Sequence, residues 1–290
     1  MHYQISHTTT YHYSQAVSLQ PHVVRLRPRS DGTQTLTSFS LLVSPSPQQQ
    51  SQVIDLEGNN TSKIWFPPVP TPSLTVQVLS QVETHRTNPF DYLLEPWAIK
   101  LPIDYPSSLL LQLQPYLATQ QGNFASPIDP VVTQMAQEIC QQVNGVTDQF
   151  LTELNQQIYK TCQYTLRETG EPAPAGLTWT QQRGSCRDFT VLFMEACRVM
   201  GLAARFVSGY QEGDPDTSDR HLHAWAEVYL PGAGWRGFDP TQGLVVADRH
   251  IALAASAIPR YAAPITGLFN QIAGSPTQST ITYQLVIQGS

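Results

Sequence analysis

The chain has 290 residues, 41% of them hydrophobic, so it can bury one large core or two modest ones. Only 13% of the residues are charged and the net charge is -6, with Lys and Arg scattered rather than clustered, which argues against nucleic acid as a partner. The chain does not open with a basic segment followed by an apolar run. It also contains no stretch of the roughly 18 apolar residues that cross a bilayer, so we expect neither a secretion signal nor a membrane partner.

The cysteines are too few for the disulfide framework of a secreted domain, and we therefore expect a cytoplasmic protein. They are Cys140, Cys162, Cys186 and Cys197. The sequence does not indicate an oligomeric state.

Residues 1–95 are predicted to form an all-β, sandwich-like domain. Apolar residues recur at every second position in two segments, as in half-buried strands: Phe39, Leu41 and Val43 in one, and Leu74, Val76, Val78 and Val82 in the other. Turn signals at Asp31-Gly32 and at residues 58–60 separate the alternating runs. The histidines of this region, His2, His7, His12 and His22, are interpreted as surface residues.

Residues 96–290 are predicted to form a second domain of α+β class, because helical patterns come first and strands follow. Asp129 and Pro130 are suited to begin a helix, and a second apolar stripe starts at Phe150. Residues 171–180 contain two prolines and are expected to be an extended connection. Strands are predicted at 204–210, 221–230, 235–239 and 281–287.

Cys186 stands just before an apolar helical pattern that Gly201 closes, and so falls in the first turn of a predicted helix. At that position unpaired backbone amides and the positive end of the helix dipole favour a thiolate and can also hold an oxyanion. Gly184 would let an extended substrate approach the sulfur. From position alone, the alternative is that Cys186 is a small hydrophobic core residue.

Two partners favour the catalytic interpretation. His223 lies in a predicted strand, Asp239 in the next one, and the short segment between them indicates a hairpin. A loop at 230–232 would place the two side chains directly opposite each other, and a loop at 231–233 would make them diagonal neighbours on one face. In either register Asp239 could orient the imidazole while His223 takes the thiol proton and passes it to the leaving group.

Neighbouring residues receive more ordinary interpretations. His221 is a polar residue at the rim, Asp188 a helix N-terminal charge, and Cys197 a core residue too far along the helix for a redox pair. Trp179 or Trp225 could line an acyl pocket, but packing is the simpler role. A metal site is disfavoured because no further Cys or His completes a familiar zinc spacing.

The sequence resembles the bacterial transglutaminase-like family, whose members are often described as candidate cysteine proteases. The resemblance covers residues 184–188, 201–210, 222–229 and 234–241, and residues 3–13 with 25–28 resemble the β-rich N-terminal domain of such proteins. It implies a papain-like transglutaminase core, with helices packed on an antiparallel sheet, and no metal or organic cofactor. Cys186, His223 and Asp239 match the family's triad by order and motif. Where many relatives carry a Gly-Arg-Asp-Tyr-like segment, this chain has Ile258-Pro259-Arg260-Tyr261.

Together the residues and the resemblance predict a thiol-dependent acyl-transfer enzyme that forms a thioester between Cys186 and an amide-bearing peptide or protein. Hydrolysis, as by a peptidase or amidase, is favoured over amine transfer because water needs no dedicated binding site. The alternatives are a protein-glutamine amine transferase that cross-links its substrates and a non-catalytic binding module that retains the fold.

Overall fold

The alternating N-terminal segments form two antiparallel sheets that face each other. The computed structural model describes residues 1–118, 120–121, 124–125, 129–167, 169–213, 221–271 and 277–290. One sheet has the order β17-β1-β6-β3 with β18 also beside β1, and the other has the order β16-β2-β5-β4. Their strands are β1 (His2–Leu19), β2 (His22–Val24), β3 (Gln34–Ser44), β4 (Gln49–Ile54), β5 (Asn60–Trp65), β6 (Thr71–Thr84), β16 (Ile265–Thr266), β17 (Phe269–Gln271) and β18 (Ser279–Gly289).

The period-two pattern of β6 explains this packing, since its alternate residues Leu74, Val76, Val78 and Val82 are at most 2% exposed. We call these two sheets the β-rich unit. The predicted sandwich-like N-terminal region is therefore confirmed.

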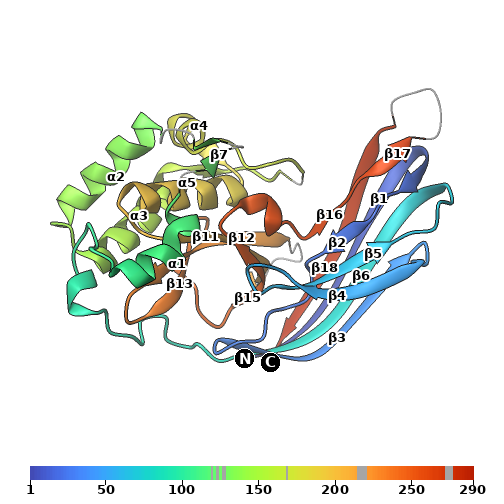
Figure 1. Ribbon diagram of the computed structural model, residues 1–290, viewed down its shortest axis with the longest axis horizontal. Helices are drawn as coiled ribbons and strands as arrows, with labels where there is room; N and C mark the ends of the chain where they lie inside the picture. The colour runs from blue at the N-terminus through green and yellow to red at the C-terminus, as the bar shows by residue number, and fades with distance from the viewer. Residues whose placement is uncertain (119, 122–123, 126–128, 168, 214–220, 272–276) are drawn as a thin grey trace.

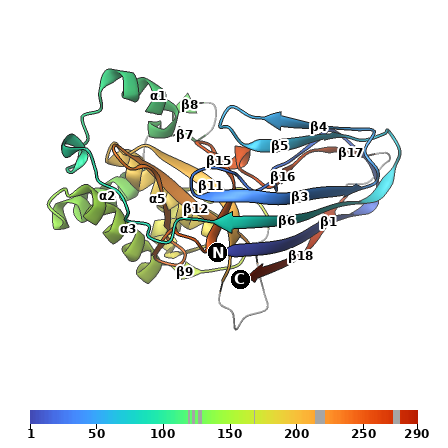
Figure 2. The ribbon, with the colours of Figure 1, turned by 90° about the horizontal axis from the view of Figure 1, so that it is seen from below.

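The last strand of the chain completes the first sheet. β18 pairs with β1 from Tyr3–Gly289 to Tyr13–Ser279, and the backbones of His2 and Ser290 exchange hydrogen bonds of 3.0 and 2.9 Å. Both ribbon views show the two termini side by side (Figures 1 and 2). The strands β16, β17 and β18 lie within the predicted second domain, 96–290, and pair with β1 and β2 of the predicted first one. A strand's pairing partner depends on long-range contacts that local alternation does not encode.

The remaining elements form an α+β core, as predicted. Its antiparallel sheet has the order β14-β13-β12-β11-β15. The strands are β11 (Ala204–Gln211), β12 (Leu222–Leu230), β13 (Gly234–Asp239), β14 (Leu244–Val245) and β15 (His250–Ser256). Its helices are η1 (Pro96–Ala98), α1 (Ser107–Leu117), α2 (Pro130–Gln142), α3 (Thr147–Thr161), α4 (Ala175–Gln181), α5 (Cys186–Val199) and η2 (Pro259–Tyr261); two short strand pairs are β7 (Gln120–Gln121) with β8 (Phe124–Ala125), and β9 (Gln163–Tyr164) with β10 (Arg183–Gly184).

This core sheet lies between the helices and the β-rich unit (Figure 1). Phe206, Ala226 and Phe238 pack with the helices in one hydrophobic cluster. Tyr210 and Ile251 belong instead to the hydrophobic cluster of the β-rich unit. The two units therefore share the core sheet as a common layer.

Two side-chain amides of the β-rich unit bind the outer strand of the core sheet. The Gln34 amide donates to the Ala252 carbonyl at 3.0 Å and its oxygen accepts from the Ala252 N–H at 2.8 Å. Asn59 makes the same pair of bonds with Ala255, at 2.8 and 2.9 Å. Backbone groups of β15 that face away from β11 are thus satisfied by amide side chains.

The helix beginning at Pro130 is confirmed, and the Asp129 carboxylate accepts from the Val131 N–H at 2.9 Å. The prediction that 171–180 is wholly extended is wrong, because α4 begins at Ala175, directly after Pro174. A proline restricts the residue before it, so the two prolines end the extended segment and leave the following residues able to form a helix. Among the described helices, none is both long and apolar enough to cross a membrane.

Candidate active site

Cys186 is the first residue of α5 and is 8% exposed. It follows β10, which runs parallel to β9 and pairs Gly184 with Tyr164. The first residues of a helix have backbone N–H groups without intrahelical acceptors, so the sulfur lies at the positive end of the helix dipole. The predicted position of Cys186 in the first helical turn is confirmed.

Asp188 fixes the start of this helix. Its Oδ2 accepts the backbone N–H and the hydroxyl of Ser185 at 2.7 and 2.8 Å. Its Oδ1 accepts the Arg167 guanidinium at 2.5 Å and the Ala173 N–H at 2.7 Å. Asp188 therefore does more than complement the dipole, because it also ties the segment before α4 to the start of α5.

The absence of a side chain at Gly184 also has a packing reason. A Cβ there would lie 2.9 Å from Cβ of Asp188 and 3.1 Å from the ring of Phe189. Gly184 thus makes room for the side chains of Asp188 and Phe189 in the first turn of α5. Its expected role in substrate approach stays a prediction.

β12 and β13 form the predicted hairpin. Leu230 pairs with Gly234, which leaves 231–233 as the loop, and Ala226 pairs with Phe238. One step further along, Asp239 lies level with Trp225, so His223 is its diagonal neighbour on the same face. The second of the two predicted registers is the one found.

His223 Nε2 and Asp239 Oδ2 are 2.7 Å apart. The Asp239 side chain is fully buried and that of His223 is 11% exposed. Burial alone would push the pKa of His223 down, but the charge of Asp239 and its hydrogen bond raise it from 6.5 to about 10. Burial would likewise raise the pKa of Asp239, but the charge of His223 and hydrogen bonds from His223 and His250 hold it below its ordinary value.

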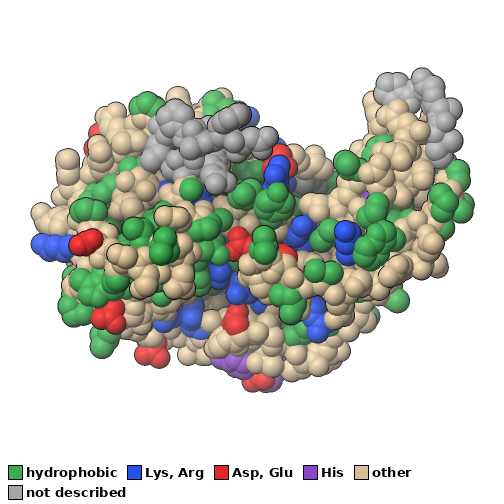
Figure 3. Space-filling model, viewed as in Figure 1, with side chains coloured by type: hydrophobic (Ala, Val, Ile, Leu, Met, Phe, Trp, Pro, Cys, Tyr) green, Lys and Arg blue, Asp and Glu red, His purple; other side chains and the backbone are tan. Residues whose placement is uncertain are grey.

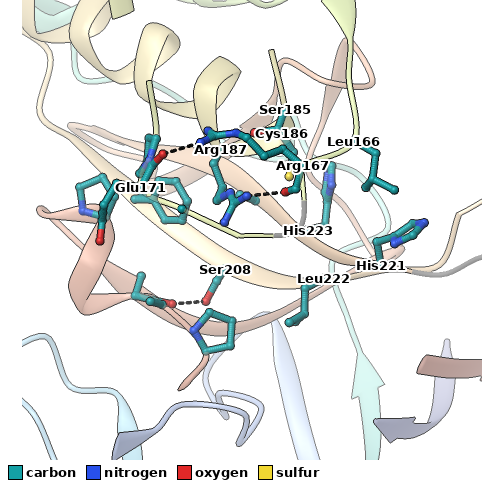
Figure 4. A pocket seen from close by; sticks show the side chains of 18 of the residues that line it. Leu166, Arg167, Glu171, Ser185, Cys186, Arg187, Ser208, His221, Leu222 and His223 are labelled. Atoms are coloured by element: carbon teal, nitrogen blue, oxygen red, sulfur yellow. Dashed lines mark hydrogen bonds between the residues drawn. The ribbon is translucent and has the colours of Figure 1, made fainter. Parts of the chain in front are cut away.

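The sulfur of Cys186 lies beside the ring of His223 (Figure 4). A hydrogen bond to Cys186 is one of the interactions that raise the pKa of His223. Because Nε2 is engaged by Asp239, Nδ1 is the ring nitrogen left for the sulfur. The three side chains thus form a chain of contacts from thiol to imidazole to carboxylate.

His250, the first residue of β15, joins this arrangement and was not predicted. Its Nε2 lies 3.1 Å from Oδ2 of Asp239, and its side chain is 3% exposed. The only sequence signal is a histidine that precedes an apolar run, and local spacing does not reveal which strand such a residue faces.

His223, Asp239 and His250 place three potential metal ligands within 4.8 Å of one another. However, Nε2 of His223 and Nε2 of His250 are both hydrogen-bonded to the same oxygen, Oδ2 of Asp239. An ion bound by these two nitrogens would have to occupy the position of that oxygen. The geometry is therefore that of one carboxylate held by two imidazoles.

Cys186 and His223 line a cleft of about 200 Å³ between the core and the β-rich unit. Its lining comes from β9, residues 166–167 and 170–172, α5, β11, β12 and η2 of the core, and from β1 and β18. Thr9, Ile281 and Tyr283 are the contributions of the β-rich unit. On the face seen in Figure 3, charged side chains of both signs are scattered among hydrophobic and uncharged polar ones.

His221 lies on the rim of this cleft, as predicted, and its Nδ1 is hydrogen-bonded to the Tyr283 hydroxyl. Trp179 and Trp225 are not among the described residues that line the cleft, and both pack in hydrophobic clusters. The surface interpretation of His7 and His22 is wrong, because they are 0% and 6% exposed. A histidine on the inward face of a strand is buried when it finds partners, as His7 does with Tyr210 and Thr9.

All four cysteines are free thiols. Burial raises the pKa of Cys162 to about 11, raises that of Cys140, and raises that of Cys197 well above its ordinary value. Cys197 is fully buried, which confirms its interpretation as a core residue.

Comparison with known proteins identifies relatives over nearly the whole chain. An uncharacterized protein of Mycobacterium tuberculosis is 29% identical over 265 residues, covering 87% of this chain and 82% of that protein. A protein-glutamine gamma-glutamyltransferase of Pseudomonas aeruginosa is 31% identical over 87 residues, which are 27% of this chain and 13% of that protein.

The fold is that of a candidate cysteine protease from Cytophaga hutchinsonii, whose crystal structure matches with a TM-score of 0.71 at 18% identity, covering 100% of this chain and 91% of that one. Residues 3–83 match the model of the bacterial transglutaminase-like N-terminal region, and residues 133–240 match that of the transglutaminase-like superfamily. The chain therefore belongs to the transglutaminase-like superfamily, with a bacterial transglutaminase-like N-terminal region joined to the core.

Proposed function

We propose that this protein is a thiol-dependent acyl-transfer enzyme that cleaves amide bonds in peptides or proteins, with Cys186 as nucleophile, His223 as general base and acid, and Asp239 as the orienting carboxylate. The observation that carries the proposal is the contact chain from the Cys186 sulfur through His223 to Asp239, with its 2.7 Å hydrogen bond, at the wall of a cleft. Such a chain activates a cysteine and holds the imidazole in one orientation.

In the first step, the Cys186 sulfur attacks the amide carbon and His223 Nδ1 holds the thiol proton. The carbonyl oxygen becomes negatively charged, and the backbone N–H of Cys186, which has no intrahelical acceptor, is placed to donate to it. When the carbon–nitrogen bond breaks, the amine leaves with the proton from His223, and the acyl group remains as a thioester on Cys186.

In the second step, water attacks the thioester, His223 takes one of its protons, and the products are a carboxylic acid and the restored thiol. The raised pKa of His223 supports the first step, because an imidazolium held by Asp239 stabilises a neighbouring thiolate. Hydrolysis is proposed over amine transfer because the cleft is open to solvent water and a second substrate is not required.

The cleft favours a substrate with an apolar side chain near the amide. The arginines of its lining are engaged by the protein: Arg167 binds Asp188, Arg187 donates to the Thr169 carbonyl, and Arg260 donates to the Tyr261 hydroxyl. The surface left for a ligand includes Phe206, Leu222, Pro264 and Ile281. Burial of an apolar side chain against this surface contributes to binding by the hydrophobic effect.

Alkylation tests the nucleophile. Near neutral pH, iodoacetamide should modify Cys186 much faster than the other three thiols, whose pKa values are raised by burial. His223→Gln should remove most of this preference. Similar slow modification of all four cysteines in the folded protein would favour a non-catalytic binding module instead.

Substrate profiling tests the reaction. Peptides with internal and side-chain amides are incubated with and without a labelled primary amine, and Cys186→Ala serves as the inactive control. We expect new carboxylates, formed by water, in the protein with Cys186. Incorporation of the amine without hydrolysis would assign the protein as an amine transferase.

A further inference from the structure

His250 makes a contact that the proposed mechanism does not use. Oδ2 of Asp239 is shared by His223 at 2.7 Å and His250 at 3.1 Å. Oδ1 accepts the backbone N–H groups of Thr241 at 2.9 Å and Gln242 at 3.2 Å. Since a carboxylate offers about four acceptor sites, Asp239 is fully hydrogen-bonded, and His250 supplies the one side-chain donor besides His223 among these contacts.

The two ring nitrogens of His250 have different surroundings. Nδ1 is buried and has no hydrogen-bond partner among the described residues. Nε2 lies 3.1 Å from Oδ2 of Asp239, and because a carboxylate oxygen accepts, the Nε2–H group is the donor of this hydrogen bond. His250 therefore has one hydrogen-bond partner among the described residues, which is the carboxylate that also holds His223.

The ring of His250 is also held in place from the side. It packs edge-on against Trp225 at a centroid distance of 5.2 Å. Trp225 in turn covers Gly209 on β11, where a Cβ would lie 2.3 Å from the indole and 2.4 Å from the Ile251 carbonyl. The missing side chain of Gly209 thus lets Trp225 lie across the strand and reach His250.

We propose that His250 is a positioning residue: its Nε2–H fixes Oδ2 of Asp239 in the orientation that aligns His223 with Cys186. The inference rests on the proposed roles of those three residues. His250 is not among the described residues lining the cleft, so it acts through Asp239 rather than on a substrate. A rigid supporting hydrogen bond of this kind keeps a reactive group within a few tenths of an ångström of its working geometry.

The test measures the rate constant of Cys186 alkylation by iodoacetamide near neutral pH in full-length variants. His250→Leu removes the donor and should slow the reaction roughly 10-fold or more, the effect of one hydrogen bond to a charged group. His250→Gln presents an amide N–H near the position of Nε2 and should recover most of the rate. The side chain introduced by His250→Asn is equally polar but too short to reach Oδ2, so alkylation of Cys186 should be slow in this variant as well. If the Leu variant does not fold, the Asn variant provides the comparison with His250→Gln.

A double-mutant cycle separates this role from a general structural one. In an Asp239→Asn background, His250→Leu should change the alkylation rate by less than about 2-fold, because the carboxylate through which His250 acts is already absent. His22→Leu is the matched control: His22 is also buried and binds the Gln20 carbonyl, so its loss should lower stability while leaving the rate unchanged.

Three outcomes for the rate constant of Cys186 alkylation would overturn the inference. The rate could be unchanged in His250→Leu, it could fall equally in the Gln and Leu variants, or the effect of His250→Leu could persist in the Asp239→Asn background. Uniform slow alkylation of all four cysteines before any substitution would instead overturn the proposed function, and the inference with it.

Discussion

The side chain of Asn59 forms two hydrogen bonds with the backbone of Ala255, one to its carbonyl at 2.8 Å and one from its N–H at 2.9 Å. The amide thus takes the place of a neighbouring strand at the outer edge of the core sheet. Asn59 is 1% exposed, although its sequence context indicates only a turn. A turn residue of the β-rich unit therefore helps to fix the position of the core sheet.

Asn59→Ala should lower the free energy of unfolding by roughly 2 kcal/mol or more, because two buried backbone groups lose their partners. The adjacent Asn60 is exposed, so Asn60→Ala is the control and should change stability by less than about 0.5 kcal/mol. Urea titration measures both values. Equal effects of the two substitutions would contradict a specific role for the Asn59 amide.

The pH dependence of stability should report the His223–Asp239 pair. The pKa of His223 is raised in the folded protein from 6.5 to about 10, so its stabilising contribution is complete below 6.5 and is lost as the pH rises through about 10. The pKa of Asp239 is lowered, so its contribution is lost only as the pH falls below the ordinary carboxyl range. Urea titrations at about pH 6 and about pH 10 should show the stability gap between the unsubstituted protein and His223→Gln narrowing at the higher pH. A constant gap would show that the two residues are not coupled by charge.

Asp188→Ala should destabilise the protein by roughly 3 kcal/mol, because the carboxylate accepts four hydrogen bonds at the start of α5. Asp188→Asn keeps one acceptor oxygen, so its free energy of unfolding should lie between those of the unsubstituted protein and Asp188→Ala. Thermal or urea unfolding measures the effect, with the exposed Asp104→Ala as the control for loss of a carboxylate. If Asp188 served only the helix dipole, its removal would cost no more than about 1 kcal/mol.

Ile281→Asp should reduce labelling of Cys186 by a leucyl chloromethyl ketone roughly 10-fold, because it places a charge on the apolar lining of the cleft. Labelling by iodoacetamide, which needs no binding surface, should be unchanged. Thr280 precedes Ile281 on β18 and is exposed, which makes Thr280→Asp the matched control. Equal labelling of the Ile281 and Thr280 variants by the leucyl probe would remove β18 from the substrate-binding surface.

The local parts of the candidate site could be predicted from the sequence. A helix start at Cys186 follows from the apolar period of 3.6 residues behind it, and the His223–Asp239 relationship follows from two alternating strands joined by a short loop. In both cases the determining contacts lie within about twenty residues of one another. The catalytic roles themselves stay predictions.

What the sequence did not reveal depends on contacts between distant segments. His250 reaches Asp239 because β15 pairs with β11, and it packs against Trp225, which Gly209 allows to lie across β11. The extension of the β-rich unit to β18 depends on pairing between the two ends of the chain. A periodic pattern identifies a strand but not its neighbour, so both features required the fold.

The pairing of β18 with β1 has a consequence for biosynthesis. As the chain emerges from the ribosome, residues Tyr3 to Tyr13 of β1 can pair early with β6 along one edge. Their other edge stays unpaired until Ser279 to Gly289 has been synthesised. The core that carries Cys186 is translated in that interval. A nascent or C-terminally shortened chain would therefore present a long unpaired strand to its neighbours, and only the finished protein closes it.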